Sequence, residues 1–130
     1  KDKADEYKQR YNSMDNALID EQADYLRTFY HSDCLVTDTS SVIPEYFLTG
    51  KPIIYCYNDR SRNQYQYNKG MSRAFYWVKT WEELEKTLNM LKQGDDPLRE
   101  KRACMISEFL QEKGNAGKKI GDIILHDAFK

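Results

Sequence analysis

The chain has 130 residues, which is enough for one domain built on one hydrophobic core. Its acidic and basic residues nearly cancel to a formal net charge of -1, which excludes a general electrostatic attraction to nucleic acid or to an anionic membrane surface. Hydrophobic residues make up 40% and aromatic residues 13%, so the composition excludes a disordered tail, and no apolar run approaches the ~20 residues that span a bilayer.

The three cysteines, Cys34, Cys56 and Cys104, are far apart and form no Cys-x-x-Cys pair. This pattern predicts free thiols and is typical of a reducing cytoplasm. The sequence contains no signal-peptide pattern, and it begins with Lys1, so we expect a piece of a longer protein that holds part of any site elsewhere. It contains no metal-ligand spacing, Walker motif or nucleophile elbow, so we expect no metal and no cofactor.

In the amino-terminal third of the chain, the sequence patterns that indicate secondary structure differ in strength. Residues 1–15 are polar and predict a short exposed helix or a loop, and residues 16–20 predict a short strand. A helix is then expected with Asp20 as its cap, because Ala23, Leu26, Phe29 and Tyr30 fall on one face at helical spacing.

Two apolar runs, residues 34–37 and 53–57, predict parallel strands on either side of a short helix. The first run is expected to be a central strand. In the helix between them, Pro44 favours Ser40 or Ser41 as the N-cap, because proline is tolerated only in the first turn. Gly50 is expected at the C′ position.

Residues 58–70 are rich in polar side chains and are expected to be irregular, and residues 75–78 predict a third, shorter strand. Thr80 and Glu83 form a capping box for a helix that ends near Gly94.

Asp96 and Pro97 are expected to open the next helix, with the aspartate as cap and the proline at the first helical position. A last helix is expected at residues 117–126. The aromatic residues Phe75, Tyr76, Trp77 and Trp81 are interpreted as core rather than as a platform for a sugar.

The strand–turn–helix unit at residues 35–52 carries the candidate site. Ser40 and Ser41 lie beyond the carboxyl end of a strand, where a turn and a helix N-terminus offer N–H groups and hydroxyls to an anion. The alternative is that one serine caps the helix and the other fills the turn. Glu45, one helical turn after Ser41, either accepts hydrogen bonds from ribose hydroxyls or is a solvated glutamate near the helix start.

The segment after the second strand is a further candidate. Its basic and aromatic side chains either close over a diphosphate, meet an anionic acceptor, stack on bases or form a solvated surface loop. They are Arg60, Arg62, Tyr65, Tyr67, Lys69 and Arg73.

These residues carry a resemblance. The run Ser-Asp-x-Leu-x-Thr-Asp-x-Ser-Ser at 32–41, then Glu45-Tyr46 and Thr49-Gly50-Lys51-Pro52-Ile53, resembles the C-terminal domain of the CDP-glycerol glycerophosphotransferase family, which makes teichoic acid and related capsule polymers. Asp24-Tyr25-Leu26 and Gly117-Lys118-Lys119-Ile120 also fit, so the resemblance covers about residues 16–125.

The resemblance implies an α/β fold: a Rossmann-like three-layer α/β/α half of a GT-B enzyme, with a short parallel sheet flanked by helices. We expect residues 1–130 to form one domain, the C-terminal domain that binds the donor nucleotide. It implies that Ser40, Ser41 and Thr39 contact the donor's phosphates, that Thr37 and Asp38 shape the turn, and that Glu45 binds the ribose. Loop contacts would come from Arg60, Arg62 and Lys69.

The sequence departs from the family in two ways. Thr39 stands where the family often has Tyr or Ser. The family's catalytic histidines belong to its N-terminal domain and to a His-Pro motif, and neither is present here; His31 and His126 match no family motif. We therefore expect no catalytic residue in this fragment and no activity from it alone.

The implied function is transfer of glycerol phosphate from CDP-glycerol to a lipid-linked or polymeric acceptor, by an enzyme that includes a missing N-terminal domain. The protein would then be cytoplasmic and peripheral to the inner face of the cell membrane, and nucleic acid is not an expected partner. Two alternatives stay open. One is a GT-B glycosyltransferase that uses a nucleotide sugar for capsule or lipopolysaccharide, and the other is a non-catalytic α/β binding module.

Overall fold

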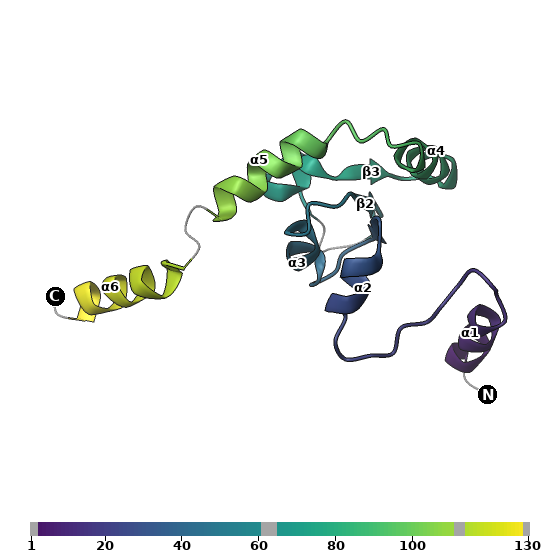
Figure 1. The fold of residues 1–130 in the computed structure, drawn as a ribbon, viewed down its shortest axis with the longest axis horizontal. Coiled ribbons are helices and arrows are strands. Elements are labelled where there is room, and N and C mark those ends of the chain that lie inside the picture. The colour runs from purple at the N-terminus through teal and green to yellow at the C-terminus, as the bar shows by residue number, and fades with distance from the viewer. Residues whose placement is uncertain (1–2, 61–64, 111–113, 129–130) are drawn as a thin grey trace. The chain divides into compact units, whose positions relative to one another are not determined.

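The structure is a computed structural model that describes residues 3–60, 65–110 and 114–128 (Figure 1). The chain divides into two compact units, residues 1–32 and residues 33–130. Within the described residues, no helix combines the length and the apolar character needed to cross a membrane.

The first unit contains two helices, α1 (Lys3–Asn12) and α2 (Leu26–His31). The strand expected at residues 16–20 is wrong, because this segment consists of turns and irregular backbone. The Asp20 carboxylate accepts hydrogen bonds from the Gln22 N–H and the Thr28 hydroxyl, which favours a turn over a strand.

The helix expected from Asp20 begins instead at Leu26, where Asp24 Oδ1 accepts the Leu26 N–H at 3.0 Å. A short polar side chain that bonds the backbone two residues later stabilises a turn. The helical spacing of apolar residues therefore extended further than the helix itself.

The second unit is built on a parallel sheet of three strands, β1 (Leu35–Thr37), β2 (Ile53–Cys56) and β3 (Tyr76–Val78), in the order β1-β2-β3. This confirms the α/β class and the short parallel sheet. The central strand is β2, whose first three residues are buried, and β1 lies at an edge of the described sheet with Val36 43% exposed. The prediction that the first strand is central is therefore wrong for the described sheet.

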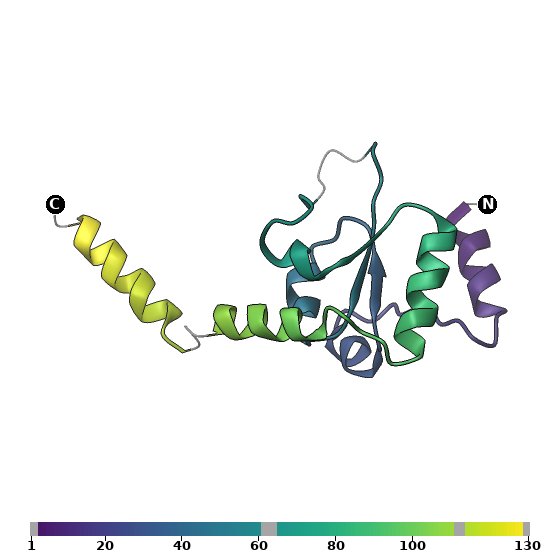
Figure 2. The ribbon, with the colours of Figure 1, turned by 90° about the horizontal axis from the view of Figure 1, so that it is seen from above.

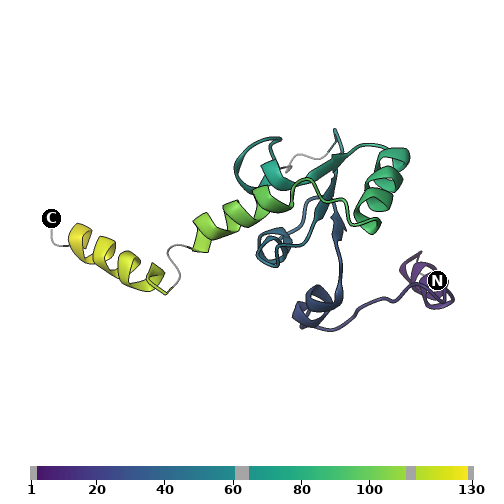
Figure 3. The ribbon, with the colours of Figure 1, turned by 45° about the horizontal axis from the view of Figure 1, so that its top comes forward.

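Helices cover both faces of this sheet. The helix α4 (Trp81–Lys92) lies against one face, while α3 (Ile43–Phe47) and α5 (Arg99–Leu110) lie on the other (Figures 2 and 3). A 3₁₀ helix, η1 (Gly70–Ala74), precedes β3 and packs against α5, and α6 (Ala116–Ala128) is the last element. The sequence did not indicate η1.

Both ends of α4 follow the expected chemistry. Thr80 Oγ1 accepts the Glu83 N–H at 3.2 Å, and Glu83 Oε2 accepts the Lys79 N–H at 2.6 Å. At the other end Gly94 has a φ of 84°, and the Gly94 and Asp95 N–H groups bond the carbonyls of the last turn. This pair of bonds is the Schellman arrangement, which favours glycine because of the positive φ.

The start of α5 differs from expectation. The helix begins at Arg99, and the Asp96 carboxylate does not cap it but binds the buried guanidinium of Arg102. Pro97 lies in the turn before the helix. Asp96 pairs with Arg102, a residue of α5 itself, and the local sequence pattern did not indicate this pairing.

The core under α3 is aromatic. Phe47 packs edge-on against Phe75 at 6.2 Å and against Phe109 at 6.4 Å between ring centroids. Phe75 is buried, as the core interpretation expects, but Trp81 is 72% exposed and lies on the first turn of α4 outside the core.

Cys34 and Cys56 are half-buried, Cys104 is exposed, and all three are free thiols. Burial raises the pKa of the Cys34 and Cys56 thiols, so both favour the protonated form.

Candidate functional site

The turn that follows β1 holds the candidate phosphate-binding residues. The Thr37 hydroxyl donates to the Asp38 carbonyl at 3.2 Å. Ser40 Oγ accepts the Val42 N–H at 3.4 Å, and the Ser40 carbonyl lies 3.5 Å from the Ile43 nitrogen. Hydrogen bonds between its own side-chain hydroxyls and backbone groups thus stabilise the turn, as is common where Ser and Thr lie in turns.

The expectation that Ser40 or Ser41 is the N-cap is wrong. The helix α3 begins at Ile43, and Val42 occupies the N-cap position without a side-chain cap. Ser40 stabilises the preceding turn instead, and Ser41 is exposed there. Because α3 has only five residues, its dipole is short, and the chemistry of this turn depends on its hydroxyls and amides.

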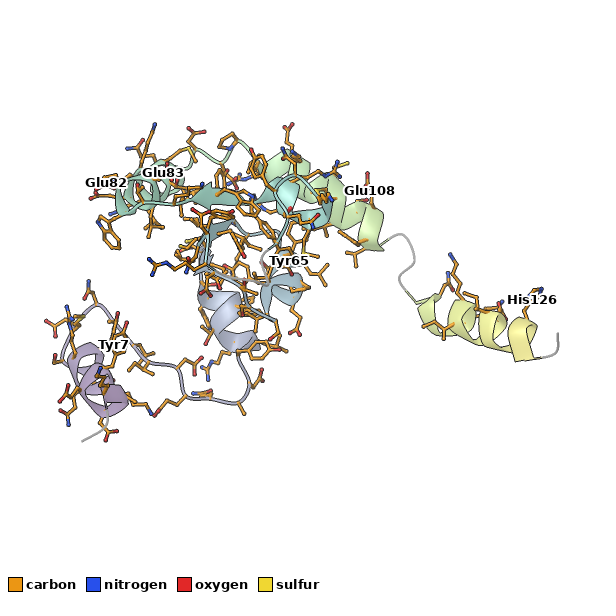
Figure 4. The ribbon with its side chains drawn as sticks, turned by 180° about the vertical axis from the view of Figure 1, so that it is seen from behind. Tyr7, Tyr65, Glu82, Glu83, Glu108 and His126 are labelled. Carbon is orange, nitrogen blue, oxygen red and sulfur yellow. The ribbon has the colours of Figure 1, made fainter. Side chains whose placement is uncertain are left out.

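A buried tyrosine of the central strand contacts the turn that follows β1 through its hydroxyl. Tyr55 is 1% exposed, and its hydroxyl lies 3.0 Å from Thr39 Oγ1 and accepts the Tyr65 N–H at 3.3 Å. Tyr65 also packs against Tyr55 with ring centroids 6.0 Å apart (Tyr65 is labelled in Figure 4). One phenol therefore links the turn after β1 to the segment after β2.

Sequence reasoning missed this role of Tyr55. The available signal was a tyrosine within an otherwise apolar strand, because a buried phenol nearly always has a hydrogen-bond partner.

Glu45 lies in the first turn of α3 with an exposed side chain, one helical turn after Ser41. Its helix neighbours Tyr46 and Phe47 are buried, so α3 keeps this carboxylate on the solvent side while it anchors in the core. The end of the helix is marked by Gly50, which has a φ of 76° and lies two residues beyond the C-cap Leu48, one position later than expected.

The basic side chains of the following segment are partly described. Arg60 is exposed, and its N–H bonds Asn58 Oδ1 at 2.9 Å. Lys69 precedes η1, and its N–H lies 3.2 Å from the buried Ser72 hydroxyl. Arg62 lies outside the described residues. The hydrogen bonds of the Arg60 and Lys69 N–H groups stay within the segment that follows β2.

A second polar cluster lies at the opposite, amino-terminal edge of the sheet. The Arg102 guanidinium, 1% exposed, donates to both carboxylate oxygens of Asp96 and to the Gly50 carbonyl at 2.8 Å. The Tyr76 hydroxyl donates to Asp96 at 2.6 Å and accepts the Leu98 N–H at 3.2 Å. This cluster joins α5, β3 and the end of α3.

The cluster shifts the titration of its members. Burial raises the pKa of Tyr76 to about 12, with a further contribution from its hydrogen bond to Asp96. Burial also opposes ionisation of Asp96, but hydrogen bonds from Arg102 and Tyr76 outweigh it and lower the pKa of that carboxyl. Because ligands of parallel α/β sheets bind at the carboxyl edge, this cluster is structural.

The described residues contain no group of three or more His, Cys, Asp or Glu side chains placed to hold a metal ion. The turn at the carboxyl end of β1 offers hydroxyls and backbone amides. Hydroxyls and amides at this edge are groups suited to bind an anion, and the scaffold that carries them defines a protein of the parallel α/β class.

Comparison with known families gives the particular family. The family model described as CDP-Glycerol:Poly(glycerophosphate) glycerophosphotransferase matches residues 3–126, nearly the whole chain, and the chain belongs to this family. The family is a transferase family, and the resemblance found in the sequence is confirmed. No curated protein and no solved structure matches.

Proposed function

We propose that this chain is the donor-binding domain of an enzyme that transfers glycerol phosphate from CDP-glycerol to a poly(glycerophosphate) acceptor. The observation that carries the proposal is the Thr-Asp-Thr-Ser-Ser turn at the carboxyl edge of a parallel sheet, in a chain that the glycerophosphotransferase family model matches over residues 3–126.

In this proposal Ser40, Ser41 and Thr39 bind the donor's phosphates through hydroxyls and backbone N–H groups, while Thr37 and Asp38 shape the turn. The bond from Thr39 to Tyr55 supports this assignment, because it fixes the turn to the buried central strand. Hydrogen-bond donors that are already held in place stabilise the negative charge that develops during transfer without a further cost of reorganisation.

Glu45 is proposed to accept hydrogen bonds from the vicinal hydroxyls of the ribose, because it is exposed and follows Ser41 by one helical turn. Arg60, Arg62 and Lys69 are proposed to close over the diphosphate from the adjacent segment. Cationic side chains in this place would neutralise the leaving group.

The proposed reaction is a displacement at the donor's β-phosphorus. The acceptor hydroxyl oxygen forms the new bond to phosphorus, the bond to the bridging oxygen breaks, and CMP leaves with the electron pair. The acceptor's proton goes to a general base outside this chain, so we expect the isolated chain to be inactive. Its place would be the biosynthesis of teichoic acid or a similar cell-surface polymer at the inner face of the membrane.

Two other functions predict different ligands. A nucleotide-sugar transferase would prefer a UDP-sugar, and a binding module without a nucleotide would bind none of them. In the second case Ser40→Ala, Ser41→Ala and Glu45→Ala would change only stability, by ~1 kcal/mol or less.

The deciding experiment is an NMR titration of the chain with CDP-glycerol, with CMP, UDP-glucose and UDP-N-acetylglucosamine as comparators. We expect CDP-glycerol to shift the amide signals of Ser40, Ser41 and Glu45, and we expect the Ser40→Ala/Ser41→Ala variant to lose the effect. Ser107→Ala, which removes an exposed hydroxyl on α5, is the matched control and should bind as the parent does.

Undiminished binding by the double serine variant would contradict the assigned site, and preference for a UDP-sugar would contradict the assigned donor. Binding of none of these nucleotides would contradict the donor-binding assignment.

A further inference from the structure

A recess lies at the carboxyl edge of the sheet, where β2 and β3 end. It has a volume of about 360 Å³ and is lined by Tyr57, Tyr67, Trp77, Lys79 and Glu83, and we call it the aromatic recess. Its volume is at the lower end of the range for small-molecule sites. Nothing in the donor site described above uses these five side chains.

The walls of the recess are aromatic rings set at steep angles. The Trp77 ring lies 5.4 Å from Tyr67 with an interplanar angle of 78°, and 6.0 Å from Tyr57 with an angle of 52°. The indole Nε1–H donates to the Ser72 carbonyl at 3.1 Å, so Trp77 is fixed in place and presents carbon surface. Tyr67 is 66% exposed at the rim.

Two charged groups complete the recess. Lys79 Nζ lies 4.7 Å from the centre of the Tyr57 ring, a cation–π distance. Glu83 lies at the start of α4 (labelled in Figure 4), where one carboxylate oxygen accepts the Lys79 N–H. The recess therefore combines a cation for an anionic group, a carboxylate that accepts from hydroxyls, and apolar walls that pack against C–H bonds.

We propose that the aromatic recess binds one polyol-phosphate repeat of the acceptor polymer. A phosphodiester-linked polyol has all three matching parts: an anionic phosphate, hydroxyl donors and a carbon chain. Rings that meet at 52° and 78° provide no pair of parallel walls for a flat base, which favours the polyol over a nucleobase. The inference rests on the proposed function, because it assigns the acceptor of that transfer.

The test uses the two tryptophans of the chain as reporters. The probe is a poly(glycerophosphate) oligomer of defined length, followed by the indole N–H signals in NMR spectra. We expect the oligomer to shift the signal of Trp77 and to leave that of Trp81, which is exposed outside the recess, unchanged. Glycerol 3-phosphate should act at the same residue more weakly, and inorganic phosphate should have no effect on the indole.

Two variants on the rim avoid the core. Tyr67→Ala should weaken oligomer binding about fivefold through the loss of one aromatic wall. Lys79→Gln should weaken it about threefold at low salt, and the difference should vanish at high salt because the contact is electrostatic. The matched controls are Tyr30→Ala, a 77% exposed tyrosine of α2, and Lys86→Gln on α4, and both should bind as the parent does.

The outcomes separate this inference from the donor assignment. If CDP-glycerol shifts Ser40 and Ser41 but the oligomer leaves Trp77 unchanged, the recess inference is overturned alone. If CMP shifts Trp77 more than the oligomer does, the recess is a nucleobase site and the inference is wrong. If the oligomer shifts Trp77 and binding survives Tyr67→Ala and Lys79→Gln undiminished, the contact lies elsewhere and the assignment of the recess falls.

Discussion

The buried Arg102–Asp96 pair joins α5 to the end of α3. Both side chains are almost fully buried, and the guanidinium also bonds the Gly50 carbonyl. Burying a charge costs free energy, and in a buried ion pair the attraction between the two charges offsets that cost. If one partner is removed, the remaining charge is buried without this compensation.

Asp96→Asn should therefore destabilise the chain by about 3–5 kcal/mol, measured as the free energy of unfolding in urea. The neighbouring exposed Asp95→Asn is the control and should cost less than about 0.5 kcal/mol. A loss as small as the control's would show that the pair contributes no net stability.

The lowered pKa of Asp96 gives the same pair a pH signature. A carboxyl whose folded pKa lies below its unfolded value contributes stability above the unfolded value, near 4, and loses it as the pH falls through the folded pKa. The parent should therefore lose stability more steeply below about pH 4 than Asp96→Asn does. Parallel acid slopes would contradict this.

Tyr76 should make the stability of the chain depend on pH in the alkaline range. Its pKa of about 12 lies above the ordinary value of 10.0, so its contribution is complete below pH 10 and is lost as the pH rises toward 12. Tyr76→Phe should cost about 1–3 kcal/mol at neutral pH, because the Leu98 N–H loses its acceptor, and should flatten the alkaline decline. Unfolding followed from pH 8 to pH 12 measures both effects.

At the scale of elements, the short helix α3 depends on how it ends. Gly50 has a φ of 76°, although a Cβ there would meet only Ile106 Cδ1 at 4.0 Å. The constraint on this position is therefore the backbone conformation and not lack of space.

Gly50→Ala should destabilise the chain by about 1–2 kcal/mol, measured by thermal unfolding. Gly117→Ala in α6, where no positive φ occurs and nothing lies within 4 Å of a new Cβ, should be neutral or slightly stabilising for the helix. Equal effects of the two substitutions would show that the αL requirement at Gly50 is weak.

At the scale of the whole molecule, charge decides which partners are excluded. A formal net charge of -1 gives the chain no broad attraction to phosphates. In an electrophoretic mobility shift assay at physiological salt, the chain should retard neither single-stranded nor double-stranded DNA. Retardation that weakens steeply with added salt would contradict the prediction.

Most of the elements of the second unit could be predicted from local sequence. The runs of apolar residues located β1, β2 and β3, and Thr80, Glu83 and Gly94 located the ends of α4, because these signals act within a few residues. The Thr-Asp-x-Ser-Ser motif could also be recognised in the sequence, and the family match over residues 3–126 confirms the resemblance to which it belongs.

Contacts between distant residues could not be predicted in this way. Only the folded chain brings Tyr55 beneath Thr39, pairs Arg102 with Asp96 and carries the Arg102 guanidinium to Gly50, 52 positions earlier. The pairing with Arg102 engages the aspartate expected to cap α5, and pairing with both β1 and β3 makes β2 the central strand of the described sheet.

The sequence by itself determined the α/β class, the family and the position of the candidate turn, because periodicity and motif order are properties of neighbouring residues. The tertiary structure decided which polar groups are buried together and which side chains frame the aromatic recess. The physical reason is that the desolvation of a polar group, and hence its need for a buried partner, depends on all the elements packed around it and not on its own segment alone.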